Sequence, residues 1–265
     1  MTKARVAHVG LALMPAWRKQ VGESATGGAS GIGFATAKRL LERGALVYLT
    51  DINEEALKQA ASTLHDPARV CAHCLDVTKR NAVKAAIISA KERFGRLDAI
   101  GSIAGTGGRR LGHESIWETT SDEYDFNFDI NVRGTFSILS EALAPGMIKE
   151  PGSSIVCVGS MFSLQGFEKG AVFAASKHAM TGLVKSAAKE VGKRGIRVNA
   201  LLPGAIDTPM YRQHLNSGFP GPGPDAPLSR VGKAEEVAEV IVFLLSGEAS
   251  FVTGSLYGVD GGQNC

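Results

Sequence analysis

The chain of 265 residues lacks the features that mark three classes of protein. Its only cysteines are Cys71, Cys74, Cys157 and Cys265, which excludes a disulfide-rich scaffold and predicts a reducing compartment, the cytoplasm. No apolar run approaches the roughly 20 residues that a membrane-spanning helix requires, so no membrane role is expected. The 29 basic residues are mixed with 26 acidic ones and form no run, so nucleic acid is not an expected partner.

The sequence also lacks a recognisable metal site. Cys71 and Cys74 have the C-x-x-C spacing, but no second Cys/His pair accompanies them. Their segment, Arg69–Val77, has the pattern of a strand, where a small thiol has an ordinary packing role. We therefore expect no bound metal.

Glycine, by contrast, is abundant, with 32 residues, or about 12 % of the chain against an average of about 7 %. Glycine is needed where the backbone approaches a ligand closely or adopts a positive φ. The densest group, Thr26–Gly33 (TGGASGIG), comes directly before a segment of helical periodicity. The free N–H groups at the start of a helix can bind an anion such as a pyrophosphate, so this turn predicts a nucleotide site.

From Thr26 onward, short apolar or β-branched runs alternate with longer segments of helical periodicity. This alternation predicts an α/β fold, a Rossmann-type doubly wound parallel sheet in a three-layer α/β/α arrangement. The expected strands are Ala45–Thr50, Arg69–Leu75, Leu97–Ile103, Ser154–Gly159, Ile196–Leu202 and Ser255–Val259. The expected helices are Ile32–Arg43, Glu54–Leu64, Asn81–Phe94, Asp122–Leu143, Ala171–Lys193 and Ala234–Leu245.

The segment Asn216–Pro227 (NSGFPGPGPDAP) has the composition of an interdomain linker. Only one helix and one strand are expected after it, which is too little for a second core. We therefore predict a single dinucleotide-binding and catalytic domain over residues 1–265. Residues 208–228 are predicted to form a mobile lid over the substrate.

Asp51 ends the first expected strand after the glycine turn, about 20 residues downstream of it. A carboxylate at this position can accept hydrogen bonds from both hydroxyls of an adenosine ribose. Asp51 could instead cap the helix that begins at Glu54, but the combined spacing favours the ligand role. Because the carboxylate repels a 2′-phosphate and neither Ser30 nor Ile52 carries a positive charge, NAD is favoured over NADP.

These features, together with others in the same order, resemble the classical short-chain dehydrogenase/reductase family from Thr26 to the C-terminus. The resemblance implies an NAD(P)-dependent oxidoreductase acting on CH–OH groups, with a small-molecule alcohol or ketone as substrate. It also implies a homodimer or homotetramer, assembled through the two long helices Asp122–Leu143 and Ala171–Lys193. Ser102–Gly105 (SIAG) resembles the family's Asn-Asn-Ala-Gly segment, although both asparagines are absent.

Several positions correspond to the family's cofactor contacts. Asp76 and Val77 resemble its adenine-contacting pair, and the segment with Ile206 and Thr208 resembles the one that meets the nicotinamide. The predicted cofactor-binding residues are Gly27, Ser30, Gly31, Ile32, Gly33, Asp51, Asp76, Val77, Ala104, Gly105, Arg133, Lys177, Ile206 and Thr208.

The family's catalysis uses a serine, a tyrosine and a lysine, in which the lysine lowers the pKa of the tyrosine and the phenol moves a proton. Ser160 and Lys177 match the serine and the lysine, and Asn131 matches an active-site asparagine. Phe173 stands where the tyrosine belongs, four residues before Lys177 and therefore on the same helix face. Phenylalanine has no hydroxyl and transfers no proton. The predicted catalytic positions are thus Ser160, Lys177, Asn131 and Phe173.

Three interpretations of Phe173 remain open. The protein is a working oxidoreductase that uses Ser160, Lys177 or a water chain; it is a cofactor-binding homologue without turnover that acts as a scaffold or partner subunit; or Phe173 is an engineered or gene-specific change. Because Asn131, Ser160 and Lys177 all remain, the first and third together are favoured over the second. Of the four tyrosines, only Tyr211, in the predicted lid, is expected to reach the pocket.

The substrate contacts expected from the sequence are apolar or aromatic. They favour a lipophilic small molecule such as a terpenoid, polyketide or steroid alcohol. The expected contacts are Met161, Phe162, Gln165, Phe167 and the segment Tyr211–Phe219.

The N-terminal segment departs from the pattern of a nucleotide-binding fold. Lys3 and Arg5 before an apolar run resemble a secretory signal, but the segment includes His8 and has no convincing cleavage site. A phosphate-binding turn should follow a buried strand directly, whereas the best strand pattern lies earlier, at Arg5–Val9. We therefore hypothesise that residues 10–25 are an insertion, such as translated intron sequence, between the first strand and the turn.

Overall fold

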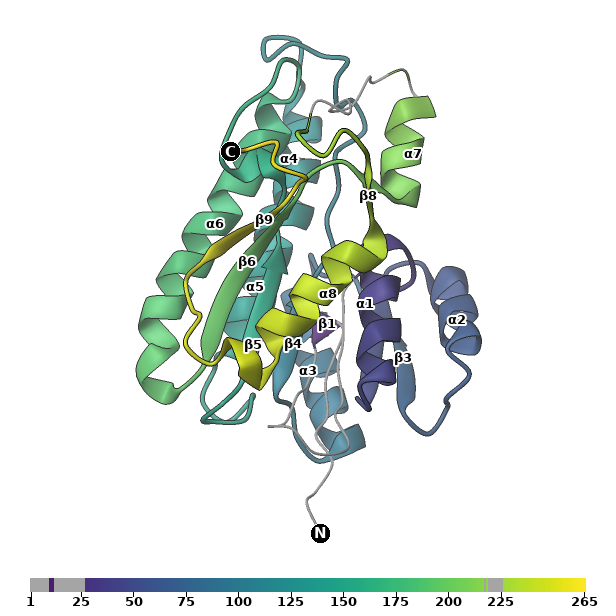
Figure 1. Cartoon of the computed structure of the whole chain (residues 1–265), viewed down its shortest axis with the longest axis vertical. Coiled ribbons are helices and arrows are strands. Elements are labelled where there is room, and N and C mark those ends of the chain that lie inside the picture. Colours follow the sequence, from purple (N-terminus) through teal and green to yellow (C-terminus); the bar gives the residue numbers. More distant parts are fainter. Residues whose placement is uncertain (1–9, 12–26, 217, 219–225) are drawn as a thin grey trace.

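The computed structural model describes residues 10–11, 27–216, 218 and 226–265, in which strands and helices alternate along the chain (Figure 1). The strands are β1 (Gly10–Leu11), β2 (Val47–Asp51), β3 (Val70–Cys74), β4 (Ala99–Ser102), β5 (Ser154–Val158), β6 (Arg197–Pro203), β7 (Ile206–Asp207), β8 (Gly232–Lys233) and β9 (Leu256–Val259). The helices are α1 (Gly31–Glu42), α2 (Glu54–Thr63), α3 (Arg80–Phe94), α4 (Ser121–Phe128), α5 (Gly134–Ala142), α6 (Ala171–Val191), α7 (Pro209–Asn216) and α8 (Ala234–Leu245).

The strands form two parallel groups that lie side by side. In the first group, β2 pairs with β3 in parallel, with Val47 opposite Val70. In the second, the order is β4, β5, β6 and β9, all parallel, so that Ser154 lies opposite Ala99 on one side and Arg197 on the other. The carboxyl ends of these strands therefore share one edge of the sheet, where ligands bind in doubly wound folds.

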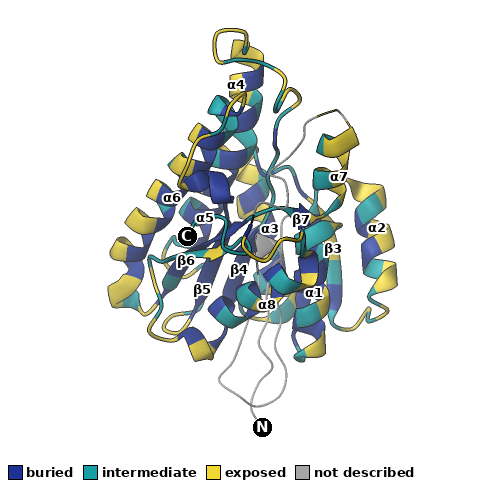
Figure 2. Cartoon of the chain, turned by 45° about the horizontal axis from the view of Figure 1, so that its top comes forward, coloured by how far each residue is buried: buried dark blue, intermediate teal, exposed yellow. Residues whose placement is uncertain are grey.

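Helices cover both faces of the strands. Helices α1 and α8 pack together on one face, and α3, α5 and α6 pack in sequence on the other. Every residue of β5 is buried, as expected for a strand covered on both sides. Figure 2 shows the same division: the central strands are dark blue, and the helices expose only their outward surfaces. The predicted three-layer Rossmann-type fold is confirmed.

The helix predicted over residues 122–143 is found as one unbroken helical run, α4 to α5, but its middle, Asp129–Arg133, is a π-helix and not α-helical. Asn131 lies in this segment, and its side chain bonds to the backbone of Thr106 at both the N–H and the C=O group, with 2.9 Å in each bond. Wider turns of this kind are frequent at functional sites. The other expected long helix ends as α6 at Val191 and continues as a 3₁₀ turn.

The predicted first strand, residues 5–9, lies outside the described residues. So does most of the predicted insertion, residues 10–25, which therefore stays a prediction. The part that is described, β1, pairs antiparallel with β2, with Gly10 opposite Leu49. This pair differs from the wholly parallel sheet that the sequence predicts.

The described residues contain no group of three or more His, Cys, Asp or Glu side chains that could hold a metal ion. Cys71 and Cys74 lie on β3 and are free thiols. Within the same described part of the chain, no helix is both long and apolar enough to cross a membrane.

Candidate active site

The glycine-rich turn brings the start of α1 close to the backbone before it. Gly27 and Gly31 have φ values of +70° and +51°, which favour glycine. A Cβ atom at Gly33 would lie 2.0 Å from the carbonyl oxygen of Gly27, so only glycine permits this approach. No side chain caps the N-terminus of α1, and its first turn has no acidic residue. Its N–H groups therefore remain available to an anion.

A cleft of about 340 Å³ lies in front of this turn, at the carboxyl ends of β2, β3 and β4. It collects most of the cofactor-binding positions predicted from the sequence. Those that line it are Gly27, Ser30, Gly31, Ile32, Gly33, Asp51, Asp76, Val77, Ala104, Gly105 and Thr208.

The carboxylate at the end of β2 is held by backbone donors. Asp51 accepts hydrogen bonds from the N–H groups of Ala29 (3.2 Å) and Asn53 (3.0 Å). Asn53, and not Asp51, caps α2, because its side chain accepts the N–H of Ala56. The alternative capping role for Asp51 is thus excluded. Together with the free N–H groups of α1, a carboxylate at this place fits a dinucleotide, with donors for the pyrophosphate and an acceptor for the ribose hydroxyls.

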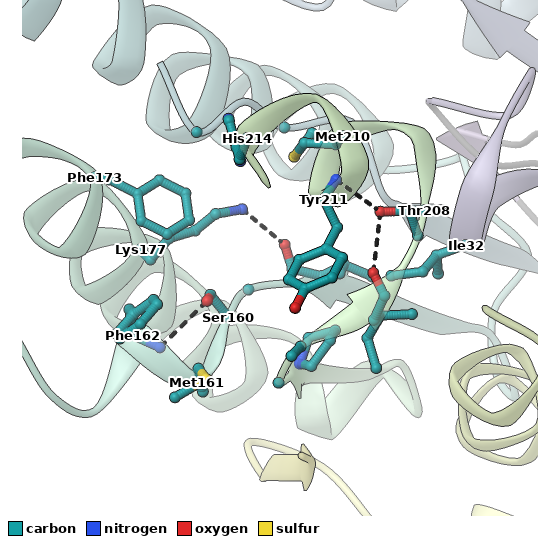
Figure 3. Close-up of a pocket in the computed structure, with 18 of the residues that line it drawn as sticks. Ile32, Ser160, Met161, Phe162, Phe173, Lys177, Thr208, Met210, Tyr211 and His214 are labelled. Atoms are coloured by element: carbon teal, nitrogen blue, oxygen red, sulfur yellow. Dashed lines mark hydrogen bonds between the residues drawn. The ribbon is translucent and has the colours of Figure 1, made fainter. Parts of the chain in front are cut away.

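A second cavity, of about 180 Å³, adjoins the cleft (Figure 3). Ile32, Gly105 and Thr208 line both spaces, so the two lie next to each other. Phe173 and Ile206 line this cavity. Its polar or titratable side chains are those of Thr106, Ser160, Lys177, Thr208, Tyr211 and His214.

Ser160 follows β5 and caps a 3₁₀ turn (Met161–Ser163) at the cavity wall. Its Oγ atom accepts the N–H of Phe162 at 3.2 Å, and its own N–H donates to the Oγ atom of Ser163 at 3.1 Å. Both bonds fix the serine. Because Oγ is the acceptor in the first bond, its hydrogen can be donated into the cavity.

Lys177 lies on α6 and is only 7 % exposed. Its Nζ atom donates to the carbonyl oxygen of Val158 at 3.3 Å, and burial lowers its pKa to about 8. A Cβ atom at Gly105 would lie 3.0 Å from Nζ, so the absence of a side chain there leaves room for the ammonium group. The structure thus places a buried cation where the cleft and the cavity meet.

Phe173 belongs to an aromatic cluster beside Lys177. Its ring makes edge contacts with Phe162 and Phe167, at centroid distances of 6.3 and 6.4 Å. The Nζ atom of Lys177 lies 5.8 Å from the centroid of the Phe173 ring, within the range of a cation–π contact. Phe173 therefore shares the cavity with Ser160 and Lys177, as the sequence predicts, but presents only a hydrocarbon ring.

Asn131 does not line the cleft or the cavity. Its Nδ2 atom donates to the Ser176 hydroxyl at 2.9 Å as well as to the Thr106 carbonyl, and the residue is 1 % exposed. All three of its hydrogen bonds hold the segment after β4 against α6. Within the described structure, Asn131 is a positioning residue.

Three other expected contacts are not brought to the site. The guanidinium of Arg133 pairs with Asp129 at 2.6 Å on the surface and does not line the cleft. Gln165 is exposed, and the Phe167 ring stacks against Phe162 with a centroid distance of 3.9 Å. Phe219 lies outside the described residues.

Leu111 also lines the cavity, although the sequence did not predict it, and so does His214, which lies in the predicted contact segment Tyr211–Phe219. His214 follows Tyr211 by three residues on α7, a spacing that places both on one helix face. That spacing was visible in the sequence, but the segment was interpreted from its glycines and prolines as a mobile insertion. Burial lowers the pKa of His214 below its usual value.

Comparisons with known proteins identify the family of the chain. Residues 27–264 match the family model described as Enoyl-(Acyl carrier protein) reductase. The chain is 40 % identical over 249 residues to the short-chain dehydrogenase/reductase aba4 of Botryotinia fuckeliana, covering 91 % of this chain and 95 % of that protein. It is 37 % identical over 251 residues to levodione reductase of Leifsonia aquatica, covering 90 % and 92 % of the two chains.

Solved structures show the same architecture. The crystal structure of levodione reductase superposes with a TM-score of 0.81 and 34 % identity, covering 90 % of this chain and 95 % of that one. A short-chain dehydrogenase/reductase from Brucella melitensis superposes with a TM-score of 0.80 and 33 % identity, covering 89 % and 94 %. The chain therefore belongs to the short-chain dehydrogenase/reductase family of oxidoreductases, which use nicotinamide cofactors.

Proposed function

We propose that the protein transfers a hydride between NAD(H) and the alcohol or ketone group of a small lipophilic molecule. One observation carries this proposal: the cavity with Ser160 and Lys177 adjoins the cleft with the glycine turn and Asp51, and Ile32, Gly105 and Thr208 line both. A substrate oxygen in the cavity would therefore lie beside the end of a dinucleotide in the cleft.

A nicotinamide cofactor, when bound, supplies a hydride or accepts one. Two side chains, those of Ser160 and Lys177, would then interact with the substrate oxygen. The Ser160 hydroxyl is free to donate a hydrogen bond to it, and the ammonium group of Lys177 stabilises negative charge that develops there. Both the hydrogen bond and the charge interaction are stronger in a cavity with apolar walls than in bulk water, because bulk water would screen the charges.

The cavity walls favour a compact, lipophilic substrate. They are formed mainly by aliphatic and aromatic side chains, and the volume of about 180 Å³ suits a small ring system. Apart from the side chains of α7, the apolar lining residues include Ile103, Leu111, Val158, Met161 and Phe162. We propose a cyclic terpenoid, polyketide or steroid alcohol or ketone. Levodione, the compound in the name of the Leifsonia aquatica relative, is the first ketone to test.

We propose that residues 208–228 form a lid over this substrate. Residues 217 and 219–225 of this range lie outside the described residues, and Thr208 and α7 line the cavity. We also propose a homodimer or homotetramer in the cytoplasm. Exposed aromatic side chains on α4 and α5, those of Tyr124 and Phe136, support a contact with another copy.

The cofactor preference is expected to be NADH over NADPH. Asp51 and Asp76 line the cleft, and none of the described lining residues is a lysine or arginine. The variant Asp51→Ala with Ile52→Arg should reverse the preference by at least about tenfold, since it removes the charge that repels a 2′-phosphate and adds one that attracts it. Fluorescence titration with both cofactors measures the change, and Ile52→Arg alone is the control. Equal affinity of the unaltered protein for both would contradict the prediction.

A second candidate function is a cofactor-binding homologue without turnover, acting as a scaffold or partner subunit. It is favoured by one observation, the hydrocarbon ring of Phe173 in place of a phenol. NADH titration tests cofactor binding, which both candidate functions require, and a failure to bind NADH would contradict both. Reduction of levodione by the unaltered protein separates them, because only the working enzyme consumes NADH.

A further inference from the structure

We propose that Tyr211 on α7 supplies the proton-transferring hydroxyl that Phe173 lacks. This inference rests on the proposed oxidoreductase function and adds the missing acid–base group to it. Tyr211 lines the same cavity as Ser160, Phe173 and Lys177. Figure 3 shows its side chain extending from α7, with the hydroxyl at the end of the ring that faces Ser160.

No other described tyrosine fills this role. Tyr48 is buried in β2, where its hydroxyl donates to Ser89 at 2.9 Å. Tyr124 lies on the surface of α4, and Tyr257 lies on β9; neither lines the cavity or the cleft. Among the tyrosines, Tyr211 alone brings a phenol to the cavity.

The start of α7 is anchored, which holds Tyr211 in place. The Oγ1 atom of Thr208 accepts the N–H of Tyr211 at 3.3 Å and donates to the carbonyl oxygen of Ile206 at the same distance. Arg212 forms a two-pronged ion pair with Asp207, at 2.6 and 2.8 Å. Tyr211 therefore lies on the turn of α7 that is joined to β7, and Thr208 itself lines the cavity.

The other polar groups of the cavity are less suited to donate the proton. An aliphatic hydroxyl such as that of Ser160 is a far weaker acid than a phenol, whose pKa is about 10. The Nζ atom of Lys177 donates to the Val158 carbonyl at 3.3 Å, so one of its protons is already engaged. The His214 ring packs over Gly107, where a Cβ atom would lie 2.3 Å from its Cε1 atom.

In the reduction of a ketone, a bound dihydronicotinamide would be the reductant and would supply a hydride, with its electron pair, to the carbonyl carbon. The π electrons of the C=O bond move to the oxygen, which takes the proton from Tyr211 as the phenolic O–H bond breaks. The half-buried phenolate then regains a proton from water. Ser160 donates a hydrogen bond to the same oxygen, and Lys177 stabilises its charge.

A double-mutant cycle tests this role. The unaltered protein, Tyr211→Phe, Phe173→Tyr and the double variant are compared for NADH-dependent reduction of levodione. Fluorescence titration measures NADH affinity, and thermal unfolding checks that each variant is folded. Tyr124→Phe, which changes an exposed tyrosine that stacks on Phe128, is the control.

Tyr211→Phe should lower the rate by about 10²- to 10⁴-fold, the usual contribution of a positioned acid or base. In the Phe173→Tyr background the same change should cost no more than about twofold, because the phenol at position 173 then donates the proton. NADH affinity should not change in any variant. Equal losses in the two backgrounds would assign Tyr211 a structural role only and overturn the proposal.

The other outcomes separate this proposal from the proposed function. If the unaltered protein reduces levodione and Tyr211→Phe is as active, the role of Tyr211 fails while the oxidoreductase function stands. If NADH binds but only the proteins with Phe173→Tyr turn over, the protein is a non-catalytic homologue, and both proposals fail. If none of the four proteins turns over, both fail as well.

Discussion

Replacing Gly33 by alanine should weaken NADH binding by at least about a hundredfold, equivalent to roughly 2.7 kcal/mol. The added Cβ atom would lie 2.0 Å from the carbonyl oxygen of Gly27, 2.7 Å from its carbonyl carbon and 3.0 Å from the Cα atom of Gly28. All three are backbone atoms, so no side chain can rotate away. The turn must open, and the N–H groups of α1 then no longer converge on the pyrophosphate.

Gly247→Ala is the matched control for this prediction. Gly247 begins a 3₁₀ turn on the surface, and a Cβ atom there would meet nothing within 4 Å. Its substitution should leave NADH affinity unchanged. Fluorescence titration of both variants measures the difference. An affinity of Gly33→Ala within about threefold of the unaltered protein, or roughly 0.6 kcal/mol, would show that this turn does not bind the pyrophosphate.

Lys177→Met should reduce the rate of ketone reduction by about 10²- to 10³-fold, the usual cost of removing one group that stabilises a developing oxyanion. Methionine has a similar length and keeps the apolar contacts, so the loss reports on the ammonium group. Lys185→Met, a change on the exposed side of the same helix, is the control and should leave the rate unchanged. Steady-state rates with saturating NADH measure both. A Lys177→Met enzyme with full activity would remove Lys177 from the mechanism.

The same substitution should alter how stability depends on pH. In the folded protein Lys177 loses its proton at about pH 8, whereas a lysine in the unfolded chain keeps it to about pH 10.5. Between these values the unfolded state binds more protons, so the free energy of unfolding rises with pH. The free energy of unfolding rises by roughly 3 kcal/mol between pH 8 and pH 10.5, and this gain is lost again as the pH falls back to 8. Lys177→Met should lack this rise, which urea unfolding at both pH values measures.

The fold could be predicted from the sequence because its signals are local. Most strands and helices were predicted with their ends near those in the structure, since apolar periodicity and helix-ending glycines define them. Gly95 and Gly195, with φ values of +85° and +71°, end helical segments as expected. The π-helix has no local signal in the sequence, and its Asn131 contacts Thr106, which lies 25 residues away along the chain.

Part of the site could also be predicted from local signals. The order and spacing of the motifs predict the cleft, and they predict Ser160 and Lys177 at the site. Arg133 was expected at the cofactor, but Asp129, four residues earlier, pairs with it on the surface. The sequence did not predict α7 as a helix, because its periodic segment is short and is followed closely by glycines and prolines.

The structure also changes how Phe173 is interpreted. The sequence indicates a working site partly because Asn131 is present, but Asn131 lines neither space, and its side chain bonds to the backbone of Thr106 and the hydroxyl of Ser176. Its presence is explained by structure alone. The case for turnover therefore depends on Ser160, Lys177 and Tyr211, which do line the cavity.

Deuterium transfer tests the central claim most directly. The unaltered protein is incubated with levodione and NADH that carries deuterium at the hydride position, and the product is analysed by mass spectrometry. We expect an alcohol with deuterium on the carbon of the former carbonyl group. NADH that binds but leaves no label on the product would contradict the claim that this cleft and cavity form a working oxidoreductase site.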